Sequence, residues 1–266
     1  MANGRQWTRD ELLVVLNVYE KVPFGLFDQQ QPVIRDLARR MRRTPGSVAM
    51  KLSNLASLDP AIKARGRKGL VGASNLDRQI WSEFQANRNE LAAVSEGLFR
   101  KLFKVGETEE VELIKGVGVI RRKTREAPEG PTETRREVAV RRGQQFFQQM
   151  VLNAFNGCCS ITGIKVRELL VASHILPWSS HPEERLNPQN GLCLSRIHDA
   201  AFDRGLITFD GDSRLVLSRE LRSALANETM QHCFRRFEGN ELSVPNKALP
   251  PRPEFLAFHR AHIFRS

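Results

Sequence analysis

The chain has 266 residues, and its 41 lysines and arginines outnumber its 30 aspartates and glutamates, which gives a formal charge of +11. This length favours two modest domains, and the positive charge favours a polyanionic partner such as nucleic acid. Apolar runs such as ELLVVLNVY fall well short of the roughly 20 residues that a membrane span needs. The first residues contain no apolar signal core, so we expect a cytoplasmic protein without a membrane segment.

The first sixty residues predict three short helices. Thr8 followed by Glu11 matches a capping box that opens an amphipathic helix. A second apolar stripe at helical spacing lies in QPVIRDLARRMRR. Thr44 as N-cap and Pro45 at the first helical position then start a third helix. In this third helix we expect a buried apolar stripe and a polar face turned to solvent. The residues expected on the polar face are Ser47, Lys51, Ser53 and Asn54.

Basic residues cluster around the second and third of these helices. A helix-turn-helix module presents one helix to DNA and grips phosphates with its flank. The residues that we expect to contact DNA are Arg39, Arg40, Arg42, Arg43 and Lys51. With its WT..E opening and the run LARRMRRTPGSVAMKLSNL, the segment 5–60 resembles Myb/SANT-type helix-turn-helix modules. The alternative is a protein-interaction module whose arginines form a solvated face.

The rest of the first half predicts more helix and then a linker. KARGRKGLVGAS is a basic, glycine-rich loop, and the apolar spacing over residues 75–103 is helical. We therefore expect an all-α domain over residues 1–103. Residues 104–136 are charged, poor in aromatics and interrupted by APEGPTE, which predicts a linker. EVELIKGVGVI within this linker is compatible with a short strand pair.

Residues 137–266 predict a second domain of mixed α+β class. A helix ending near Gly157 is followed by two β-prone segments, CCSITG and VRELLVASHILP, which we expect to form strands. A polar loop, a turn at Asn190-Gly191 and a helical stretch through Phe202 follow. GLITFD and SRLVLS predict a small hairpin, and the C-terminal residues predict a final helix.

Three sequence blocks in this domain carry a resemblance. ASHI, NGLCL and FDRGL occur in this order within residues 157–210, and the segment resembles the HNH endonuclease family. The resemblance implies a ββα-metal fold, a bound divalent cation and hydrolysis of nucleic-acid phosphodiesters. By position, His174 corresponds to the general base, and its ordinary pKa near 6.5 suits proton abstraction at neutral pH. Asn190 corresponds to the residue that braces the loop.

The third position of the motif is ambiguous in register. The family's metal ligand commonly lies about nine residues after the Asn, which leaves both His198 and Asp199 open. Asp199 and Asp203 are four residues apart and share a helix face. We therefore expect three catalytic residues and three metal ligands, with His198 in both groups. The catalytic set is His174, Asn190 and His198, and the ligand set is His198, Asp199 and Asp203.

The nature of the cation depends on the donors. Oxygen ligands favour Mg²⁺ or Mn²⁺, and Ni²⁺ or Zn²⁺ are the alternatives. Ser173 departs from the family, in which many members carry a ligand immediately before the first histidine. Cys158, Cys159 and Cys193 border the motif, and we interpret them as small buried side chains rather than as a zinc site.

The preferred interpretation is a metal-dependent HNH endonuclease that cuts double-stranded DNA, in a restriction or defence role. The front helices would hold the duplex, and a homodimer is left open. One alternative is a non-catalytic DNA-binding regulator with a degenerate HNH domain, which Ser173 favours. Another is an RNA-directed or toxin-like nuclease, against which the helix-turn-helix-like front end argues.

Overall fold

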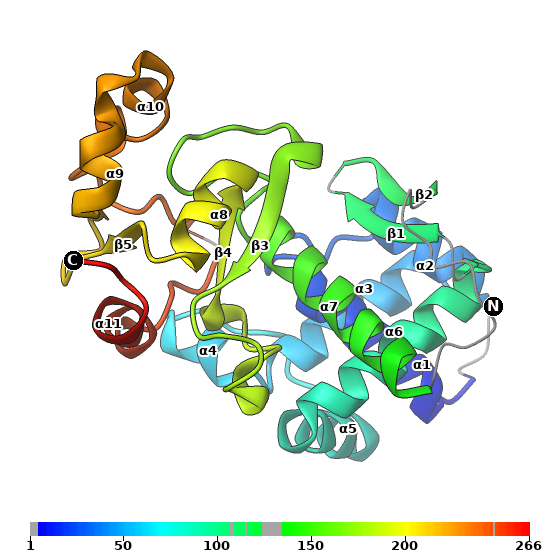
Figure 1. Ribbon diagram of the computed structural model, residues 1–266. Helices are drawn as coiled ribbons and strands as arrows, with labels where there is room; N and C mark the ends of the chain where they lie inside the picture. The colour runs from blue at the N-terminus through cyan, green and yellow to red at the C-terminus, as the bar shows by residue number, and fades with distance from the viewer. Residues whose placement is uncertain (1–4, 107–108, 115, 124–134, 247) are drawn as a thin grey trace. The chain divides into compact units, whose positions relative to one another are not determined.

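The computed structural model describes residues 5–106, 109–114, 116–123, 135–246 and 248–266. The chain divides into two compact units, Met1–Asn153 and Ala154–Ser266. Helices and two-stranded antiparallel sheets make up both units (Figure 1), which confirms the mixed α+β class. Within the described ranges, every helix is too short or too polar to cross a membrane.

Three helices open the first unit, as the sequence predicted. They are α1 (Arg9–Lys21), α2 (Pro32–Met41) and α3 (Pro45–Ala56). Thr8 and Glu11 form the predicted capping box of α1, because each side chain bonds the other residue's backbone N–H. Thr44 caps α3 through a hydrogen bond from the Ser47 backbone N–H. The apolar faces of the three helices are buried against one another.

Four further helices complete the first unit. They are α4 (Pro60–Ala64), α5 (Asn75–Ala86), α6 (Arg88–Phe103) and α7 (Arg135–Ala154). Phe84 of α5 and Phe146 of α7 pack with ring centroids 6.4 Å apart. Asn153 near the end of α7 donates a hydrogen bond to the Lys21 carbonyl at 3.0 Å. α7 therefore belongs to the core of this unit, although we had expected its residues to open the second domain.

A β-hairpin occupies part of the predicted linker. Its strands are β1 (Glu109–Ile114) and β2 (Gly118–Lys123), and β2 packs on α2. The Val119 backbone N–H donates to the Asp36 carboxylate at 3.2 Å. The hairpin is therefore part of the first unit, because one of its strands packs on α2 of that unit. Residues 124–134 of the predicted linker lie outside the described residues.

A buried ion pair lies at the centre of the first unit. The Lys21 ammonium contacts the Glu96 carboxylate, and both side chains are fully buried. Asn17 Nδ2 also donates to this carboxylate at 3.0 Å, and the ammonium lies 5.2 Å from the centroid of the Phe99 ring. Burial lowers the pKa of Lys21, which the Glu96 charge opposes. Each charge is thus tolerated only because the other is present.

The second unit is built on two small sheets. β3 (Leu170–His174) pairs with β4 (Gly191–Ser195), and β5 (Ile207–Phe209) pairs with β6 (Leu215–Leu217). Its helices are α8 (Arg196–Asp203), α9 (Arg219–Ser223), α10 (Glu228–Cys233) and α11 (Pro253–His262). The β5–β6 hairpin and the final helix confirm the sequence prediction.

The expected strand over CCSITG is wrong. Gly163 has a φ of +74°, and its N–H donates to the Cys159 carbonyl at 3.0 Å, which closes a tight turn. β3 therefore pairs with residues 191–195, which come later in the chain than the segment that we had expected. The β-prone composition of CCSITG reflects burial of Cys159 rather than an extended backbone.

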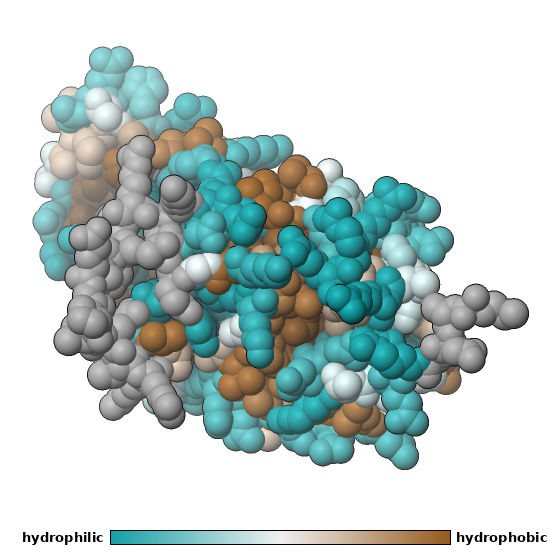
Figure 2. All heavy atoms as spheres, turned by 90° about the vertical axis from the view of Figure 1, so that its right-hand side faces the viewer, coloured by the Kyte–Doolittle hydropathy of each residue, from teal (hydrophilic) through white to brown (hydrophobic). Residues whose placement is uncertain are grey.

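On the face shown in Figure 2, hydrophilic side chains predominate and apolar side chains lie between them. Among the described large apolar side chains, exposure is high for Val71 at 101%, Val117 at 61%, Met50 at 57% and Leu70 at 53%. Single exposed apolar side chains are ordinary on protein surfaces. Met50, Leu70 and Val71, however, belong to neighbouring segments of the first unit.

Replacing Lys21 by Met tests the buried pair. Lys21→Met leaves the Glu96 carboxylate buried without its counter-charge, so we expect the free energy of unfolding to fall by about 3–5 kcal/mol. The double variant Lys21→Met/Glu96→Leu should recover most of this loss, because no buried charge then remains. Urea unfolding of the full chain measures both. Equal losses in the single and double variants would contradict the interpretation.

Candidate functional site

The frame of the candidate site is the strand pair β3–β4 together with α8. Ser173 lies opposite Leu192, and His174 lies opposite Gly191. α8 follows β4 directly and contacts both strands, with Phe202 fully buried. The end of β3, the start of β4 and α8 therefore hold the predicted residues on three connected elements.

His174 is held in one orientation at the end of β3. Its Nε2 lies 2.9 Å from the Arg185 carbonyl oxygen. Because a carbonyl only accepts, Nε2 carries the proton and Nδ1 is the basic nitrogen. The Trp178 ring packs edge-on to the imidazole, with centroids 5.2 Å apart. Burial lowers the pKa of His174, and the Arg185 charge lowers it further against the effect of the hydrogen bond. The imidazole is thus neutral at pH 7.

Asn190 holds the loop that follows His174. It is buried at the end of a short 3₁₀ turn, Pro188–Asn190. Its Oδ1 accepts from the Leu176 N–H at 2.7 Å, and its Nδ2 donates to the Glu184 carbonyl at 3.0 Å. Its own carbonyl accepts from the Ile175 N–H at 3.0 Å. These bonds tie both ends of the loop to the start of β4.

Arg185 is a residue that sequence reasoning missed. Its Nε donates to the Trp178 carbonyl at 2.7 Å, and its guanidinium lies 4.9 Å from the centroid of the Trp178 ring. Among the described residues, none accepts a hydrogen bond from its Nη atoms. The guanidinium is therefore fixed close to His174 with donors still available. A single arginine in a polar loop has no spacing signal, so the sequence offered no way to find it.

His198 is engaged on both ring nitrogens. Nδ1 lies 2.8 Å from Ser195 Oγ, and Nε2 lies 2.8 Å from the Cys233 carbonyl oxygen. The side chain is buried, and burial lowers its pKa. It also packs on the Phe234 ring, with centroids 4.9 Å apart. Of the two registers left open by the sequence, the geometry favours Asp199 as the ligand.

Asp199 and Asp203 lie one turn apart on α8 and share a helix face. Burial raises the pKa of Asp199, while the Ser173 hydroxyl and the Arg196 charge lower it. Burial and the Asp199 charge raise the pKa of Asp203 to about 6, although its side chain is still partly exposed. The two carboxylates repel each other in a partly desolvated place, and a cation between them would relieve this repulsion.

The donors around this pair fit a hard cation. Ser173 Oγ is buried next to Asp199 but makes no hydrogen bond of normal geometry with the described residues. Two carboxylates and a hydroxyl are oxygen donors, which Mg²⁺ and Mn²⁺ prefer, and Mg²⁺ usually keeps several waters. In the part of the chain that the structure describes, no three His, Cys, Asp or Glu side chains form a metal-binding group. The set thus suits an open coordination sphere better than a closed zinc site.

The cysteines near the motif are free thiols. Cys159 and Cys193 are buried, as the sequence predicted, whereas Cys158 is half-exposed. Cys159 Sγ accepts from the Ser195 N–H at 3.3 Å. Burial, together with the neighbouring thiols, raises the pKa of Cys193 to about 12. Cys159 and Cys193 thus pack as small buried side chains at β4.

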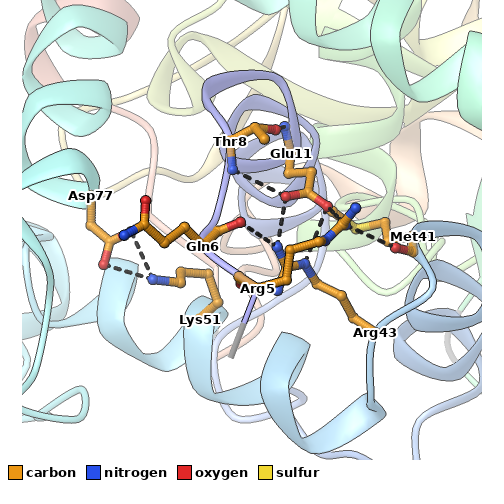
Figure 3. A network of polar contacts seen from close by, with 8 residues as sticks. All are labelled: Arg5, Gln6, Thr8, Glu11, Met41, Arg43, Lys51 and Asp77. Carbon is orange, nitrogen blue, oxygen red and sulfur yellow. Dashed lines mark hydrogen bonds and ion pairs between the residues drawn. The ribbon is translucent and has the colours of Figure 1, made fainter. Parts of the chain in front are cut away.

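Lys51 is buried, although we had expected its side chain to face solvent. Its ammonium bonds both carboxylate oxygens of Asp77 at 3.0 and 2.9 Å (Figure 3). Lys51 and Asn54 are both buried, so the prediction that they face solvent is wrong. The reason is α5, which packs on α3 and places Asp77 against Lys51.

Arg43 is likewise part of the internal structure. Its guanidinium bonds the Glu11 carboxylate at 2.7 Å (Figure 3) and lies 3.8 Å from the centroid of the Trp7 ring. Its side chain is only 8% exposed. The other three predicted DNA contacts, Arg39, Arg40 and Arg42, are exposed. Exposed cations of the predicted set therefore lie on α2 and directly after it.

Asp203→Asn tests the repulsion in the metal-free protein. The folded pKa of about 6 lies above the ordinary 3.8, so the charged carboxylate destabilises the fold increasingly between these pH values and fully above them. Because the side chain is partly exposed, we expect the variant to gain only about 1 kcal/mol at pH 8, and nothing near pH 4. Urea unfolding in EDTA measures the gain. Asp212→Asn on the exposed β5–β6 turn is the control, and an equal gain there would contradict the interpretation.

Comparison with known proteins agrees with this geometry. Residues 159–210 match the family model described as HNH endonuclease. This range contains β3, β4 and α8 with all of the predicted catalytic and ligand residues. No curated protein matches the chain. The second unit therefore contains a domain of the HNH endonuclease type.

Proposed function

We propose that the chain is a metal-dependent endonuclease that hydrolyses phosphodiester bonds of duplex DNA. The observation that carries the proposal is that β3 ends with Ser173, whose hydroxyl lies next to the Asp199 carboxylate of α8, and with the neutral His174. A base and oxygen ligands for a cation are what phosphodiester hydrolysis by water requires. The match to HNH endonucleases supports the same reaction.

In this proposal His174 Nδ1 takes a proton from the attacking water, while Nε2 stays bonded to the Arg185 carbonyl. The water oxygen forms the new bond to phosphorus, and the bond to the leaving oxygen breaks. Asn190 keeps the loop, and with it the Arg185 carbonyl, in place. Asp199 and Asp203 would hold the divalent cation, Mg²⁺ or Mn²⁺. When bound, this ion supplies positive charge to the phosphate and the leaving oxygen.

Arg185 would add a second positive group at the phosphate. Its fixed guanidinium has donors in the fork geometry that suits phosphate oxygens. Burial keeps the pKa of His174 low, and the Arg185 charge adds to this effect, so that the base stays unprotonated.

The first unit would hold the duplex through the exposed arginines Arg39, Arg40 and Arg42. Arginines on one side of a helix grip phosphates and position a protein on DNA. The helix-turn-helix resemblance of residues 5–60 supports this role. We exclude Lys51 and Arg43 from the proposed DNA interface, because their charges are compensated by Asp77 and Glu11 inside the unit. A restriction or defence role fits a chain that joins such a module to a cutting site.

A non-catalytic DNA-binding regulator is the second candidate. Ser173 favours it, because a hydroxyl is a weaker ligand than the acidic or imidazole group of related sequences. The small number of donor groups around Asp199 also favours a protein without catalytic activity. Cleavage of plasmid DNA by the purified chain in Mg²⁺ or Mn²⁺, absent in EDTA, would exclude it.

His174→Ala should lower the cleavage rate by about 10²–10⁴-fold, because the general base is lost. Binding to DNA should stay within about twofold of the wild type, since the base acts only after binding. Plasmid nicking and gel shifts measure the two quantities. His232→Ala, at an exposed histidine outside the site, is the control. Full activity of His174→Ala would refute the assignment of the base.

Arg185→Ala should lower kcat/KM by about 10–100-fold, because a phosphate contact is lost. It should also move the acid limb of the pH profile upwards. In the wild type this limb lies below the ordinary 6.5 of histidine, and without the guanidinium the pKa of His174 rises. Arg185→Lys keeps a positive charge and should move the acid limb of the pH profile part of the way back to its wild-type position. An unchanged pH profile in Arg185→Ala would show that the residue is only structural.

Replacing Arg39, Arg40 and Arg42 together by Ala should weaken DNA binding. If each contacts one phosphate, the slope of log affinity against log salt falls by up to about three. Fluorescence anisotropy at several salt concentrations measures this slope. Lys51→Met should instead reduce stability and leave the slope unchanged. The opposite pattern would place the interface on α3.

A further inference from the structure

The basic, glycine-rich loop between α4 and α5, residues 65–74, is fixed to α3 at its centre. A Cβ on Gly69 would lie 2.3 Å from the Ser57 nitrogen and 2.4 Å from the Ser53 oxygen. Only glycine fits so close to another backbone. The Leu70 N–H donates to the same Ser53 carbonyl at 3.1 Å. The backbone of the loop therefore lies directly on the C-terminal turn of α3.

The far end of the loop is fixed as well. Asn54 of α3 donates from Nδ2 to the Gly72 carbonyl at 3.4 Å. Ser74 then caps α5 in a capping box with Asp77, and Asp77 is the partner of the buried Lys51. This explains why Lys51 and Asn54 are buried: they hold the loop and the next helix against α3.

The fixed loop presents apolar side chains to solvent. Leu70 is 53% exposed, and Val71 is 101% exposed. Met50, 57% exposed, lies on α3 three residues before Ser53, to which Leu70 is bonded. Three exposed apolar side chains thus lie on α3 and on the loop that is hydrogen-bonded to it.

The charged residues of the loop and of α4 are all positive. Residues 60–76 contain no aspartate or glutamate, and their cations are Lys63, Arg65, Arg67 and Lys68. Lys63 and Lys68 are exposed. A polyanion is therefore the partner whose charge complements this loop.

We propose that residues 65–74 form a wedge whose tip, Leu70 and Val71, inserts between base pairs of duplex DNA. The proposal rests on the proposed DNA-directed function. Proteins that bend DNA often insert apolar side chains at a base step while cations hold the neighbouring phosphates. Lys51 and Asn54, two polar side chains of α3 that we had expected on its solvent-facing side, are buried. Recognition on this side of the unit therefore depends on unstacking and DNA shape.

DNA unwinding tests the wedge without a known recognition sequence. Closed circular plasmid is relaxed by a topoisomerase that needs no divalent metal, with the full chain present and EDTA added to prevent cleavage. Insertion between base pairs unwinds the duplex, so the wild type should shift the topoisomers towards lower linking number. Leu70→Ser/Val71→Ser should lose the shift, with affinity in a gel shift changed by less than about threefold, since the cations remain. Val117→Ser, at an exposed apolar residue of the β1–β2 turn, should keep it.

Each other result overturns the wedge. If the wild type binds the plasmid without a shift, or the double variant shifts it equally, the tip does not insert, and the proposed nuclease function stands. If the wild type fails to bind DNA at all in the gel shift, the proposed function fails together with the wedge. If the wild type instead binds vesicles of phosphatidylserine and phosphatidylcholine and the double variant does not, the tip serves a lipid surface.

Discussion

The repulsion between the carboxylates of Asp199 and Asp203 is the interaction on which the site depends. α8 places both groups on one face, and its packing on β3 and β4 removes part of their water. Neither a histidine nor a lysine of the described residues is bonded to them. A cation would stabilise the charged form of this pair. The metal dependence that we propose therefore has its physical basis in the packing of a short helix on two short strands.

Charge compensation also decides which cations of the first unit face outwards. Lys21, Lys51 and Arg43 are each matched by a carboxylate inside the unit. Their role is to connect helices that are distant in sequence, as α3 and α5 are connected through Asp77. Because these charges are used internally, they are not offered to a polyanion, whereas Arg39, Arg40 and Arg42 and the loop before α5 are exposed, with Arg39 paired to Asp36 at the surface. A count of basic residues alone overestimates that surface.

Local signals in the sequence predicted much of the fold. The capping box of Thr8 and Glu11, the helical spacings and the hairpin pattern of GLITFD and SRLVLS depend on near neighbours, and the elements they predicted are present. The three blocks of the motif likewise located His174, Asn190 and the aspartates on strand, turn and helix. Contacts between distant segments were not predictable: the burial of Lys51 depends on Asp77, and the sequence allowed a strand pair in EVELIKGVGVI but not its packing on α2 and Asp36. Arg185 was missed for the same reason, since only the fold brings its carbonyl to His174.

Binding of Mn²⁺ to the free chain tests the central claim most directly, because it requires neither DNA nor turnover. Electron paramagnetic resonance of added Mn²⁺ at pH 8 should show about one bound ion per chain. The binding should weaken as the pH falls below about 6, because protons then compete with the ion for the Asp203 carboxylate. Asp199→Asn/Asp203→Asn should abolish this binding. Undiminished binding by the double variant would show that the carboxylate pair does not hold the cation.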